Sequence, residues 1–378
     1  MLIGIDVGGT YTDGVVFDRG EVIATTKVPT DDNDIKSTVL QVLDKLLLKQ
    51  DKSDITRIVL STTVVTNLLA TGKGERTALL LIPGYGLPAD AYDISDDTFF
   101  LKGGIDFRGR ELDPLDEKEL IQIGDNIVAA GIKRAAIISK FGNRNDNLEK
   151  QASHYPQLSV TTGSQISGKL NFPRRATTAY YTAITSKEWN RFVDEIDQAL
   201  TERGLDCEVH ILKADGGTLA LDVSRDMPCE TVFSGPAASP MGAMALAGEG
   251  MNSVVLDIGG TTTDIALLIE GEPLYASKGA SINQRYTHIN AFAVRSIALG
   301  GDSCITVNAG QVEVQAYRRD VAACFGGSSA TVTDAFNYKF NLNIGNPELS
   351  AAALEQIGGS AMSTEEVGAA VVAIVTNR

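Results

Sequence analysis

The sequence predicts an α/β protein built from two related lobes, and three observations support this fold class. A short pattern occurs twice, as Asp-Val-Gly-Gly-Thr-Tyr-Thr-Asp at residues 6–13 and as Asp-Ile-Gly-Gly-Thr-Thr-Thr-Asp at residues 257–264. Apolar, strand-like runs alternate with helical stretches along the chain, which is typical of a sheet with many parallel strands. The length of 378 residues is enough for two or three domains, each with a sizeable core.

The repeat extends beyond this pattern. An apolar run precedes each copy, another follows it, and a glycine turn then leads to a third strand-like stretch. The offset of 251 residues holds without a gap as far as Lys27 and Lys278. Each copy therefore predicts strand, Gly-Gly-Thr turn, strand, turn and strand, because glycine permits backbone angles and close approaches that other residues do not. We predict two homologous lobes, residues 1–175 and residues 176–378.

The other elements follow from periodicity and from capping residues. After the first hairpin we predict a helix at 33–49, strand 57–60, helix 63–70, strand 77–82, an irregular excursion at 83–115, helix 116–130, and strands 134–139 and 158–161. The crossing into the second lobe is predicted to lie within a helical tract at 174–203. The second lobe is then predicted to contain strand 209–212, a tight polar loop at 214–217, helix 237–247 capped by Ser234-Gly-Pro, and a last helix at 363–375 that starts with a capping box.

Composition excludes several classes of function. Lys and Arg number 33 against 48 Asp and Glu, a net charge of −15, so we expect neither general nucleic-acid binding nor attachment to an anionic membrane surface. No apolar run approaches the roughly 20 residues that a membrane span needs, and the start of the chain shows no targeting signal. The four cysteines lie far apart without a CxxC pair, and no HExxH or closely spaced histidine pair occurs. We therefore predict reduced thiols, a cytoplasmic protein and no histidine-rich zinc site.

The repeated turn carries chemistry that suits a nucleotide. Successive backbone N–H groups in a Gly-Gly-Thr turn can bind phosphate oxygens, since glycine lets a phosphate approach without a clash. The predicted phosphate contacts are Gly8, Gly9, Thr10, Gly259, Gly260 and Thr261. Asp6 and Asp257 end the first strands, where carboxylates can hold Mg²⁺ through its waters. Asp13 and Asp264 close the turns and are candidates for orienting a water or a substrate hydroxyl. Two tight hairpins without a ligand are the alternative, and the second copy disfavours it.

At these residues the sequence resembles the actin, sugar-kinase and heat-shock ATPase superfamily, and more narrowly the hydantoinase A/5-oxoprolinase family. The segments that carry the narrower resemblance occur in the family's order along nearly the whole chain: Ser61-Thr-Thr-Val-Val-Thr-Asn67, Gly72-Lys-Gly-Glu-Arg-Thr-Ala-Leu79, Asp215-Gly216-Gly217, Ser234-Gly-Pro-Ala-Ala238 and Thr331-Val-Thr-Asp-Ala335. Taken alone, Thr63, Asn67 and Ser234 fit ordinary helix capping as well as a role in a cleft. Arg174 and Arg175 likewise fit either an anion contact or a solvated helix start.

The resemblance implies two ribonuclease H-like lobes with a nucleotide cleft between them, and ATP and Mg²⁺ as cofactors. It implies a hydrolase that opens a cyclic amide such as a hydantoin or 5-oxoproline by phosphorylating its carbonyl, with a hydantoinase B-type subunit as partner. Asp6, Asp13, Asp257 and Asp264 would be the catalytic carboxylates. Leu299-Gly300-Gly301-Asp302 is similar to a loop beside the nucleotide phosphates in heat-shock ATPases, which adds Gly300, Gly301 and Asp302 as contacts.

The chain departs from this family in ways that leave the substrate open. It lacks the longer Gly-Ala-Gly-Gly-Gly-Ser run and has Val321-Ala-Ala-Cys-Phe-Gly-Gly327 where relatives show Pro-Gly-Pro-x-Cys-Tyr-Gly. An ATP-dependent ketone carboxylase subunit, a small-metabolite kinase and a non-catalytic, ATP-driven switch acting on a protein therefore stay as alternatives. Ile357-Gly358-Gly359-Ser360 fits a linker better than the family's late adenine-binding segment, so we expect the second lobe to be incomplete at its C-terminal end.

Overall fold

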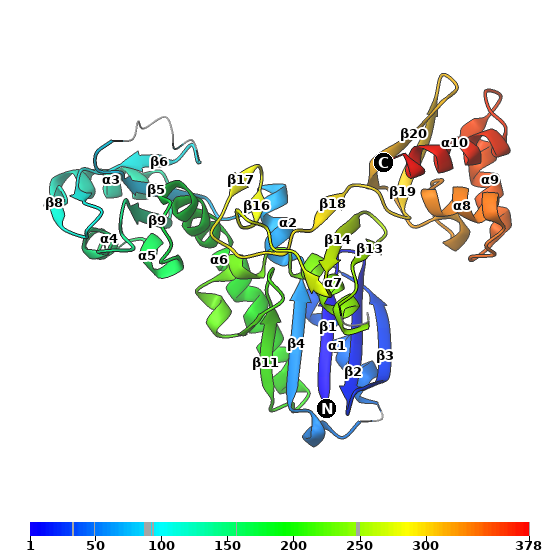
Figure 1. The fold of residues 1–378 in the computed structure, drawn as a ribbon, viewed down its shortest axis with the longest axis horizontal. Helices are drawn as coiled ribbons and strands as arrows, with labels where there is room; N and C mark the ends of the chain where they lie inside the picture. Colours follow the sequence, from blue (N-terminus) through cyan, green and yellow to red (C-terminus); the bar gives the residue numbers. More distant parts are fainter. Residues whose placement is uncertain are drawn as a thin grey trace. The chain divides into compact units, whose positions relative to one another are not determined.

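The computed structural model describes residues 1–31, 34–48, 50–86, 92, 94–155, 157–246 and 250–377. The fold is mixed α/β, as predicted, and divides into two compact units (Figure 1). Unit 1 comprises residues 1–241 and 275–293, and unit 2 comprises residues 242–274 and 294–378. A long helix spans residue 175, where the sequence placed the crossing between the lobes, and residues 275–293 return from unit 2 to unit 1.

Unit 1 contains a six-stranded sheet in the order β12-β11-β4-β1-β2-β3. Strands β1, β4 and β11 are parallel, whereas β2, β3 and β12 are antiparallel to their neighbours. The strands are β1 (Leu2–Val7), β2 (Tyr11–Asp18), β3 (Glu21–Pro29), β4 (Arg57–Thr62), β11 (Glu208–Leu212) and β12 (Thr218–Ala220). The predicted strand, turn, strand, turn, strand order of the first repeat is thus confirmed.

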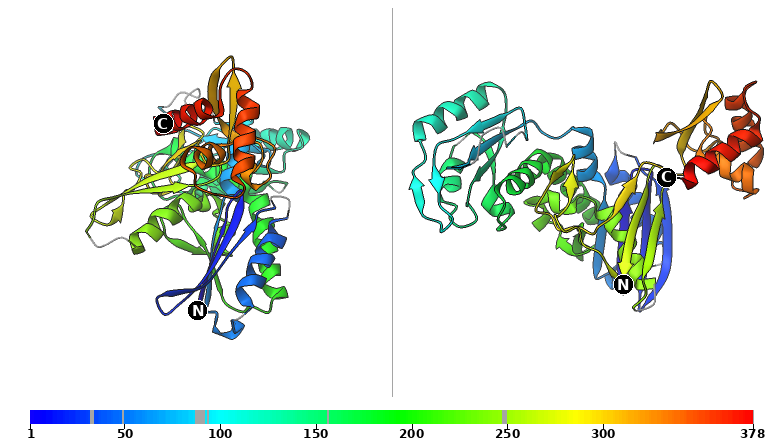
Figure 2. Two further views of the ribbon diagram at one scale, coloured as in Figure 1. Left: turned by 90° about the vertical axis from the view of Figure 1, so that its right-hand side faces the viewer. Right: turned by 45° about the horizontal axis from the view of Figure 1, so that its top comes forward.

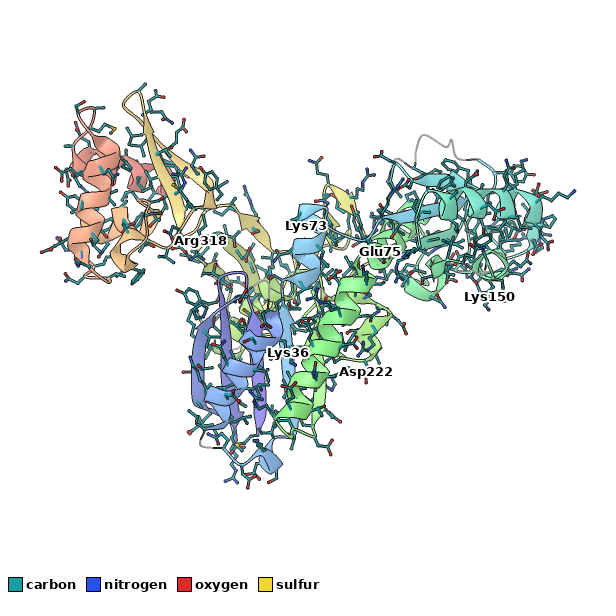
Figure 3. All side chains as sticks on the ribbon, turned by 180° about the vertical axis from the view of Figure 1, so that it is seen from behind. Lys36, Lys73, Glu75, Lys150, Asp222 and Arg318 are labelled. Atoms are coloured by element: carbon teal, nitrogen blue, oxygen red, sulfur yellow. The ribbon has the colours of Figure 1, made fainter. Side chains whose placement is uncertain are left out.

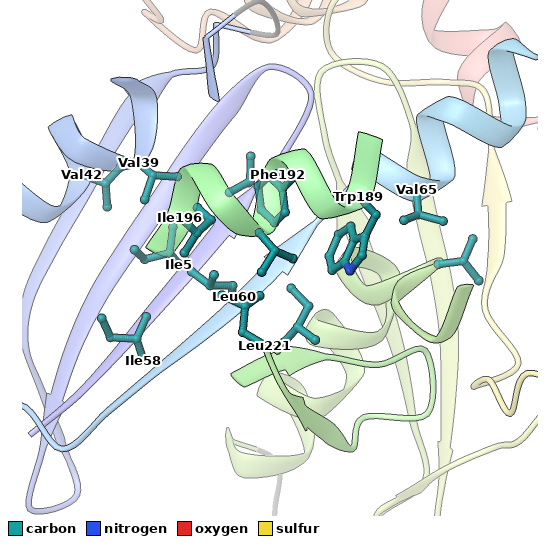
Figure 4. Packing of buried hydrophobic residues seen from close by; sticks show 14 of the residues in the cluster. Ile5, Val39, Val42, Ile58, Leu60, Val65, Trp189, Phe192, Ile196 and Leu221 are labelled. Carbon is teal, nitrogen blue, oxygen red and sulfur yellow. The ribbon is translucent and has the colours of Figure 1, made fainter. Parts of the chain in front are cut away.

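Helices α1 (Ile35–Leu47) and α6 (Phe172–Glu202) pack on this sheet, and α2 (Val64–Thr71) follows β4 (Figure 2). Side chains from the sheet and from both helices form one large core around Trp189, which is fully buried (Figure 4). The Trp189 indole donates a hydrogen bond to the hydroxyl of Ser224 at 3.0 Å, so its polar atom is satisfied. The predicted helix at 33–49 is confirmed between its ends, while residues 33 and 49 lie outside the described residues.

A second, four-stranded sheet in unit 1 is wholly parallel, in the order β10-β9-β5-β6. Its strands are β5 (Thr77–Ile82), β6 (Thr98–Phe100), β9 (Arg134–Ser139) and β10 (Ser159–Thr162). The N-terminal part of α6 covers one face, with α3 (Glu117–Ala129), α4 (Asn147–Ser153) and α5 (Gly163–Ile166) beside the same sheet. The excursion predicted as irregular contributes β6 and a short pair, β7 (Gly104–Ile105) and β8 (Glu111–Asp113), which propensity alone did not predict.

The remaining elements of unit 1 are short, except α7 (Ser234–Leu246), which continues across the unit boundary. They are the 3₁₀ turns η1 (Lys52–Asp54), η3 (Val223–Arg225) and η4 (Pro228–Thr231), and the strands β16 (Ser281–Ile282) and β17 (Arg285–Tyr286). The strands β16 and β17 belong to the returning segment, which buries Ile282 and Ile289 in the core of unit 1. The predicted end of α7 at residue 247 lies outside the described residues.

Unit 2 starts with a sheet in the order β13-β14-β15, with β18 also paired to β14. A long hairpin and three helices follow. The elements are β13 (Ser253–Ile258), β14 (Thr263–Ile269), β15 (Glu272–Pro273), β18 (Arg295–Ile297), β19 (Ser303–Asn308), β20 (Gln311–Arg318), η5 (Ala323–Phe325), α8 (Val332–Phe340), α9 (Pro347–Gly358) and α10 (Thr364–Thr376). Helix α10 starts with the predicted capping box between Ser363 and Glu366. Within the described residues, no helix is both long and apolar enough to cross a lipid bilayer.

Candidate functional site

The turn between β1 and β2 is held by backbone hydrogen bonds that leave its middle open. Gly8 donates its N–H to the carbonyl of Tyr11 at 3.2 Å, and a Cβ on Gly8 would lie 2.8 Å from the same oxygen. No atom lies within 4 Å of the position that a Cβ on Gly9 would take. Within the described residues, the N–H groups of Gly9 and Thr10 have no acceptor. This turn therefore offers two successive donors beside open space, as an anion requires.

The two aspartates of the first repeat face each other across the hairpin, since Asp6 pairs with Asp13 in the β1–β2 register. The Asp13 side chain is about half exposed, and its carboxylate accepts two hydrogen bonds from the Lys27 ammonium, at 2.8 and 3.0 Å. Lys27 also lies 5.0 Å from the centre of the Tyr11 ring. The structure thus gives Asp13 a cationic partner that sequence reasoning did not assign.

Two further predicted segments meet at the end of β1. The parallel pairing of β1 with β4 places Ser61 beside Asp6 and Thr62 beside Val7. The fully buried Ser234 at the start of α7 accepts a hydrogen bond from the Thr62 N–H at 3.2 Å and donates one to the Thr62 carbonyl at 3.0 Å. Ser234 therefore ties α7 to the strand beside Asp6, and its hydroxyl also accepts a hydrogen bond from the Ser61 hydroxyl at 3.4 Å.

A cavity of about 340 Å³ in unit 1 opens beside this strand end. Val7 and Gly8 line it from the hairpin, and Thr63 and Asn67 line it from α2. Asn67 donates to the Thr63 hydroxyl at 3.3 Å, and the Thr63 N–H donates to the Val7 carbonyl at 3.3 Å. Thr63, which caps α2, and Asn67 within α2 thus line a cavity next to the turn, a role that the sequence had left open beside ordinary capping.

The second hairpin, in unit 2, repeats the geometry of the first. Asp257 pairs with Asp264, and Gly259 donates its N–H to the Thr262 carbonyl at 2.9 Å. The register of β13 with β14 matches that of β1 with β2 at the same 251-residue offset along the whole of β1. Within the described part of the chain, the N–H groups of Gly260 and Thr261 have no acceptor. Both repeats therefore leave the same pair of turn donors available.

The Leu299–Asp302 loop packs directly on the second turn. Gly301 donates its N–H to the Gly259 carbonyl at 3.0 Å, and Asp302 donates its N–H to the Gly260 carbonyl at 2.7 Å. A Cβ on Gly300 would lie 2.4 Å from the Gly260 carbonyl carbon, a separation that no pair of carbons tolerates. Gly300 and Gly301 are thus beside the predicted phosphate turn, but their N–H groups bond within the protein, Gly300 to the Ser303 hydroxyl. They position the turn.

Two partly buried carboxylates of unit 2, Asp264 and Asp302, have a raised pKa. Burial raises the pKa of Asp264, with the nearby Asp257 carboxylate adding to the effect and a hydrogen bond from Ser296 opposing it. One carboxylate oxygen of Asp264 has no hydrogen-bond partner among the described residues. Burial likewise raises the pKa of Asp302, whose carboxylate lies 3.4 Å from the Arg318 side chain. Arg318 ends β20 and is labelled in Figure 3. The neighbouring carboxylates of Asp257 and Asp264, with the unsatisfied oxygen of Asp264, fit a divalent cation that binds oxygen ligands.

The predicted residues therefore fall into two sets in different units. Asp6, Gly8, Gly9, Thr10 and Asp13 share the first turn. The second set comprises Asp257, Gly259, Gly260, Thr261, Asp264, Gly300 and Gly301. Among the described residues, no group of three or more His, Cys, Asp or Glu side chains forms a complete metal cage.

Two models of one protein family match most of the chain. The hydantoinase/oxoprolinase N-terminal region matches residues 2–157, and the hydantoinase/oxoprolinase domain matches residues 175–341. The chain belongs to the hydantoinase/oxoprolinase family. It is 26% identical over 372 residues to the caprolactamase subunit alpha of Pseudomonas jessenii, covering 88% of this chain and 53% of that subunit.

Two solved structures related to this family share the fold. The nucleotide-free structure of acetone carboxylase, from work on ATP-dependent acetone carboxylation, superposes with a TM-score of 0.82 at 18% identity, covering all of this chain and 61% of the other. The ATP-dependent caprolactamase from Pseudomonas jessenii superposes with a TM-score of 0.78 at 22% identity, covering all of this chain and 62% of the other. The chain thus spans little more than half the length of these relatives.

Two of the family segments have a structural role here. Asp334 of the Thr-Val-Thr-Asp-Ala segment is fully buried and accepts hydrogen bonds from the N–H groups of Ala323, Cys324 and Thr331. Gly216 of the Asp-Gly-Gly segment has a positive φ of 78°, and a Cβ there would lie 2.7 Å from Met241 and Phe292. The family patterns at these positions are thus explained by loop closure and tight packing.

The two arginines at the start of α6 differ in role. Arg175 is almost completely buried and donates hydrogen bonds to the carbonyls of Ser139 and Lys169, which is a structural role. Arg174 lies 5.5 Å from the centre of the Tyr286 ring. The anion contact left open for both residues is thus disfavoured for Arg175, whose outer nitrogens are engaged by the backbone.

Sequence reasoning missed Thr30 and His288. Thr30 donates its hydroxyl hydrogen to the Gly8 carbonyl at 2.8 Å and so braces the first turn from the end of β3. The buried His288 contacts the Ser167 hydroxyl through Nδ1 at 2.8 Å and lies near Lys169 and Arg175. A polar residue after an edge strand and a lone histidine carry no spacing signal, so only the folded chain could reveal these contacts.

Proposed function

We propose that the chain is the ATP-using component of a hydrolase that opens a cyclic amide by phosphorylating its carbonyl oxygen. The observation that carries the proposal is the repeated hairpin. Each copy pairs two aspartates across the strands and leaves two successive turn N–H groups without a protein acceptor in the described part of the chain. The relationship to a caprolactamase subunit, whose name denotes a cyclic amide, supports this choice of substrate class.

In the proposed reaction, the amide carbonyl oxygen attacks the γ-phosphorus of ATP and ADP leaves. Water then adds to the activated carbon, the ring C–N bond breaks as nitrogen takes up a proton, and a second water hydrolyses the acyl phosphate to release phosphate. Phosphoryl transfer of this kind depends mainly on positioning and on neutralising charge. In this chain the N–H groups of Gly9, Thr10, Gly260 and Thr261 would bind phosphate oxygens, with added contacts from the two threonine hydroxyls.

Magnesium bound with ATP would supply further charge neutralisation. We assign Asp6 and Asp257 to the surroundings of this ion, usually through water, because both end the first strand of a repeat. Asp264, paired with Asp257 across the hairpin and raised in pKa, would add a second oxygen ligand or orient a water. Asp13 holds the equivalent place in the first repeat, where Lys27 neutralises it.

Likeness to acetone carboxylase favours a second candidate, an ATP-dependent ketone carboxylase subunit that uses the same phosphate-binding turns. Phosphoryl transfer to a small hydroxyl-bearing metabolite is the corresponding kinase alternative. We propose a second subunit of the hydantoinase B type as partner, since the caprolactamase relative is named as a subunit. The four free cysteines accord with a cytoplasmic location.

The test is phosphate release from ATP with each substrate class. Caprolactam, hydantoin or 5-oxoproline should stimulate release if the first proposal holds, and acetone with bicarbonate if the carboxylase candidate holds. Asp257→Ala should lower stimulated turnover by about 100-fold or more, because the Mg²⁺ that would neutralise charge on the transferring phosphoryl group loses the carboxylate that holds it. Glu355→Ala on the exposed face of α9 is the control and should turn over ATP normally.

Undiminished turnover in Asp257→Ala would contradict the site assignment. ATP hydrolysis that no small molecule stimulates but that a protein accelerates would instead support the switch alternative. Far-ultraviolet circular dichroism of both variants separates loss of chemistry from loss of fold.

A further inference from the structure

A second cavity, of about 770 Å³, lies at the carboxyl edge of the four-stranded parallel sheet in unit 1. Strands β5 and β6 are neighbours in this sheet, and the residues that follow them line the cavity, 83–85 after β5 and 101–103 after β6. The third wall runs from the end of β8 into the first turn of α3. Ligands of open α/β sheets bind outside the carboxyl ends of the strands, and small-molecule sites have volumes of about 300–1,000 Å³. The position and the size of this cavity therefore suit a small ligand.

Two aromatic rings belong to the wall of this cavity and are open to solvent. Tyr85 is 68% exposed and Phe100 is 37% exposed. The Tyr85 hydroxyl donates a hydrogen bond to the Asp113 carboxylate at 2.6 Å, which ties the loop after β5 to the end of β8. The ammonium of Lys140, which follows β9, donates to the Tyr85 carbonyl at 2.5 Å. Tyr85 is thus held through its hydroxyl and its backbone while its ring stays uncovered, which suits a surface that a ligand covers.

The charged groups of the lining are mostly negative. They are the carboxylates of Asp113, Asp116 and Glu119 and the ammonium of Lys102. Lys102 lies 3.7 Å from the Glu119 carboxylate, so these two charges offset each other, and Asp116 caps α3. Asp113 accepts the hydrogen bond from the neutral Tyr85 phenol and, within the described chain, forms no ion pair. The cavity therefore holds a carboxylate whose charge is not neutralised, next to an exposed aromatic ring.

We propose that this cavity binds an organic cation, an ammonium group on an apolar body, with Asp113 as the counter-ion and the rings of Tyr85 and Phe100 beside it. Hydrogen bonds between an ammonium and a carboxylate are charge-assisted, and the faces of aromatic rings attract cations. The apolar body would lie against side chains from all three walls: Pro83, Leu101, Pro114 and Leu115. An anion is disfavoured because three carboxylates and one lysine would face it.

This ligand site goes beyond the proposed function. The residues that line it in the described chain lie between 83 and 119, whereas the two repeated hairpins occupy residues 2–18 and 253–269. Its chemistry is also opposite to theirs, since the turns offer N–H donors to an anion and the cavity offers a carboxylate and aromatic faces to a cation. The chain thus carries a place for a second small molecule that is not a nucleotide.

The test measures binding of 3-phenylpropylammonium to the full 378-residue chain by isothermal titration calorimetry. The neutral probe 3-phenylpropanol has nearly the same shape and serves as the comparison. The alcohol should bind at least about 10-fold more weakly than the ammonium, because only the ammonium gains from the charge of Asp113. No binding of the ammonium at millimolar concentration, or equal affinity for both probes, would overturn the proposal without the use of any variant.

Two variants locate the binding. Asp113→Asn keeps an acceptor for the Tyr85 hydroxyl but removes the charge, so it should weaken binding of the ammonium by about 10-fold or more and change binding of the alcohol little. Tyr85→Leu keeps an apolar side chain but removes the aromatic face, so it should weaken binding of the ammonium by about 3-fold or more. Unchanged affinity for the ammonium in Asp113→Asn would contradict the assignment of the counter-ion.

Asp125→Asn is the matched control. On α3, Asp125 accepts a hydrogen bond from the Tyr155 hydroxyl at 2.7 Å, so the variant makes the same chemical change in a second exposed tyrosine–aspartate pair outside the cavity lining. It should bind both probes as the wild type does. Equal loss of binding in Asp113→Asn and Asp125→Asn would show a general effect of surface charge and would overturn the site.

These readouts do not depend on ATP turnover. Asp257→Ala should bind 3-phenylpropylammonium as the wild type does even where it abolishes phosphate release, because Asp257 belongs to unit 2 and the cavity to unit 1. Failure of cation binding and failure of the proposed activity are therefore separate results.

Discussion

Gly300 gives the sharpest test of how unit 2 holds its phosphate turn. In Gly300→Ala, the new Cβ would lie 2.4 Å from the carbonyl carbon of Gly260 and 2.5 Å from the nitrogen of Thr261. Ordinary contact between such atoms needs roughly 3.5 Å, so the turn and the loop must separate by about 1 Å. The obstacle is backbone on both sides, which no change of rotamer relieves.

Two effects should follow from a shift of this size. Overpacking should lower the free energy of unfolding by about 1–3 kcal/mol. A displacement of about 1 Å at a site that depends on positioning can cost about 100-fold in rate, so nucleotide turnover should fall by about that factor. The hydrogen bonds from Gly301 to Gly259 and from Asp302 to Gly260 would lengthen together, which couples the two effects.

Chemical denaturation followed by circular dichroism measures the first effect, and binding of a fluorescent ATP analogue with phosphate release measures the second. Gly368→Ala is the control in the same unit, because its Cβ would meet no atom closer than 3.7 Å and α10 should tolerate or prefer alanine. Gly9→Ala is a second control for stability, since its Cβ would enter open space. Wild-type stability together with wild-type nucleotide affinity in Gly300→Ala would refute the view that this loop positions the turn.

Two further predictions concern unit 1. Burial and the charges of Arg175, Lys169 and Arg174 lower the pKa of His288 to about 4, although the Leu170 carbonyl favours the charged ring. The unfolded chain then binds a proton at His288 near pH 6.5, whereas the folded chain does not, so the stability of the wild type should fall as pH drops from about 6.5 to 4. The difference in denaturation midpoint between the wild type and His288→Asn should therefore shrink over that range. A constant difference would contradict this. Ser224→Ala should lower the free energy of unfolding by about 1–3 kcal/mol, because the buried Trp189 N–H loses its acceptor. The loss should be clearly smaller in a Trp189→Phe background. Equal losses in both backgrounds would exclude the hydrogen bond as the cause.

Much of the fold could be predicted because local patterns and the repeat act over short distances. The strands of both hairpins, the helix within 35–47 and the parallel strands at 77–82 and 134–139 follow from apolar runs and turn residues. Strands β6, β7 and β8 escaped prediction because they are only two or three residues long and form through pairing with distant or irregular segments. The same holds for the return of residues 275–293 to unit 1, since no local feature records that their apolar side chains complete a distant core.

The sequence likewise predicted the positions of the candidate site residues but not their chemical environments. The repeat fixes the spacing of its aspartates, so the sequence alone showed Asp6, Asp13, Asp257 and Asp264. In the structure, Asp6 pairs with Asp13 and Asp257 with Asp264, each pair across a hairpin. Their chemical differences were not visible, since Lys27 neutralises Asp13 while burial and Asp257 raise the pKa of Asp264.

By itself, the sequence determined the repeated turn, the residues at its corners and the family to which the chain belongs, because glycine and aspartate at fixed spacing constrain the backbone locally. Tertiary structure alone decided that Gly301 and Asp302 donate their N–H groups to the second turn. It also decided that Ser234 is tied to β4, and that Leu256 is exposed where Ile5 is buried. The physical reason is that burial and hydrogen-bond partnership depend on which distant segments pack together. Two strands that share one pairing register can therefore meet opposite surroundings.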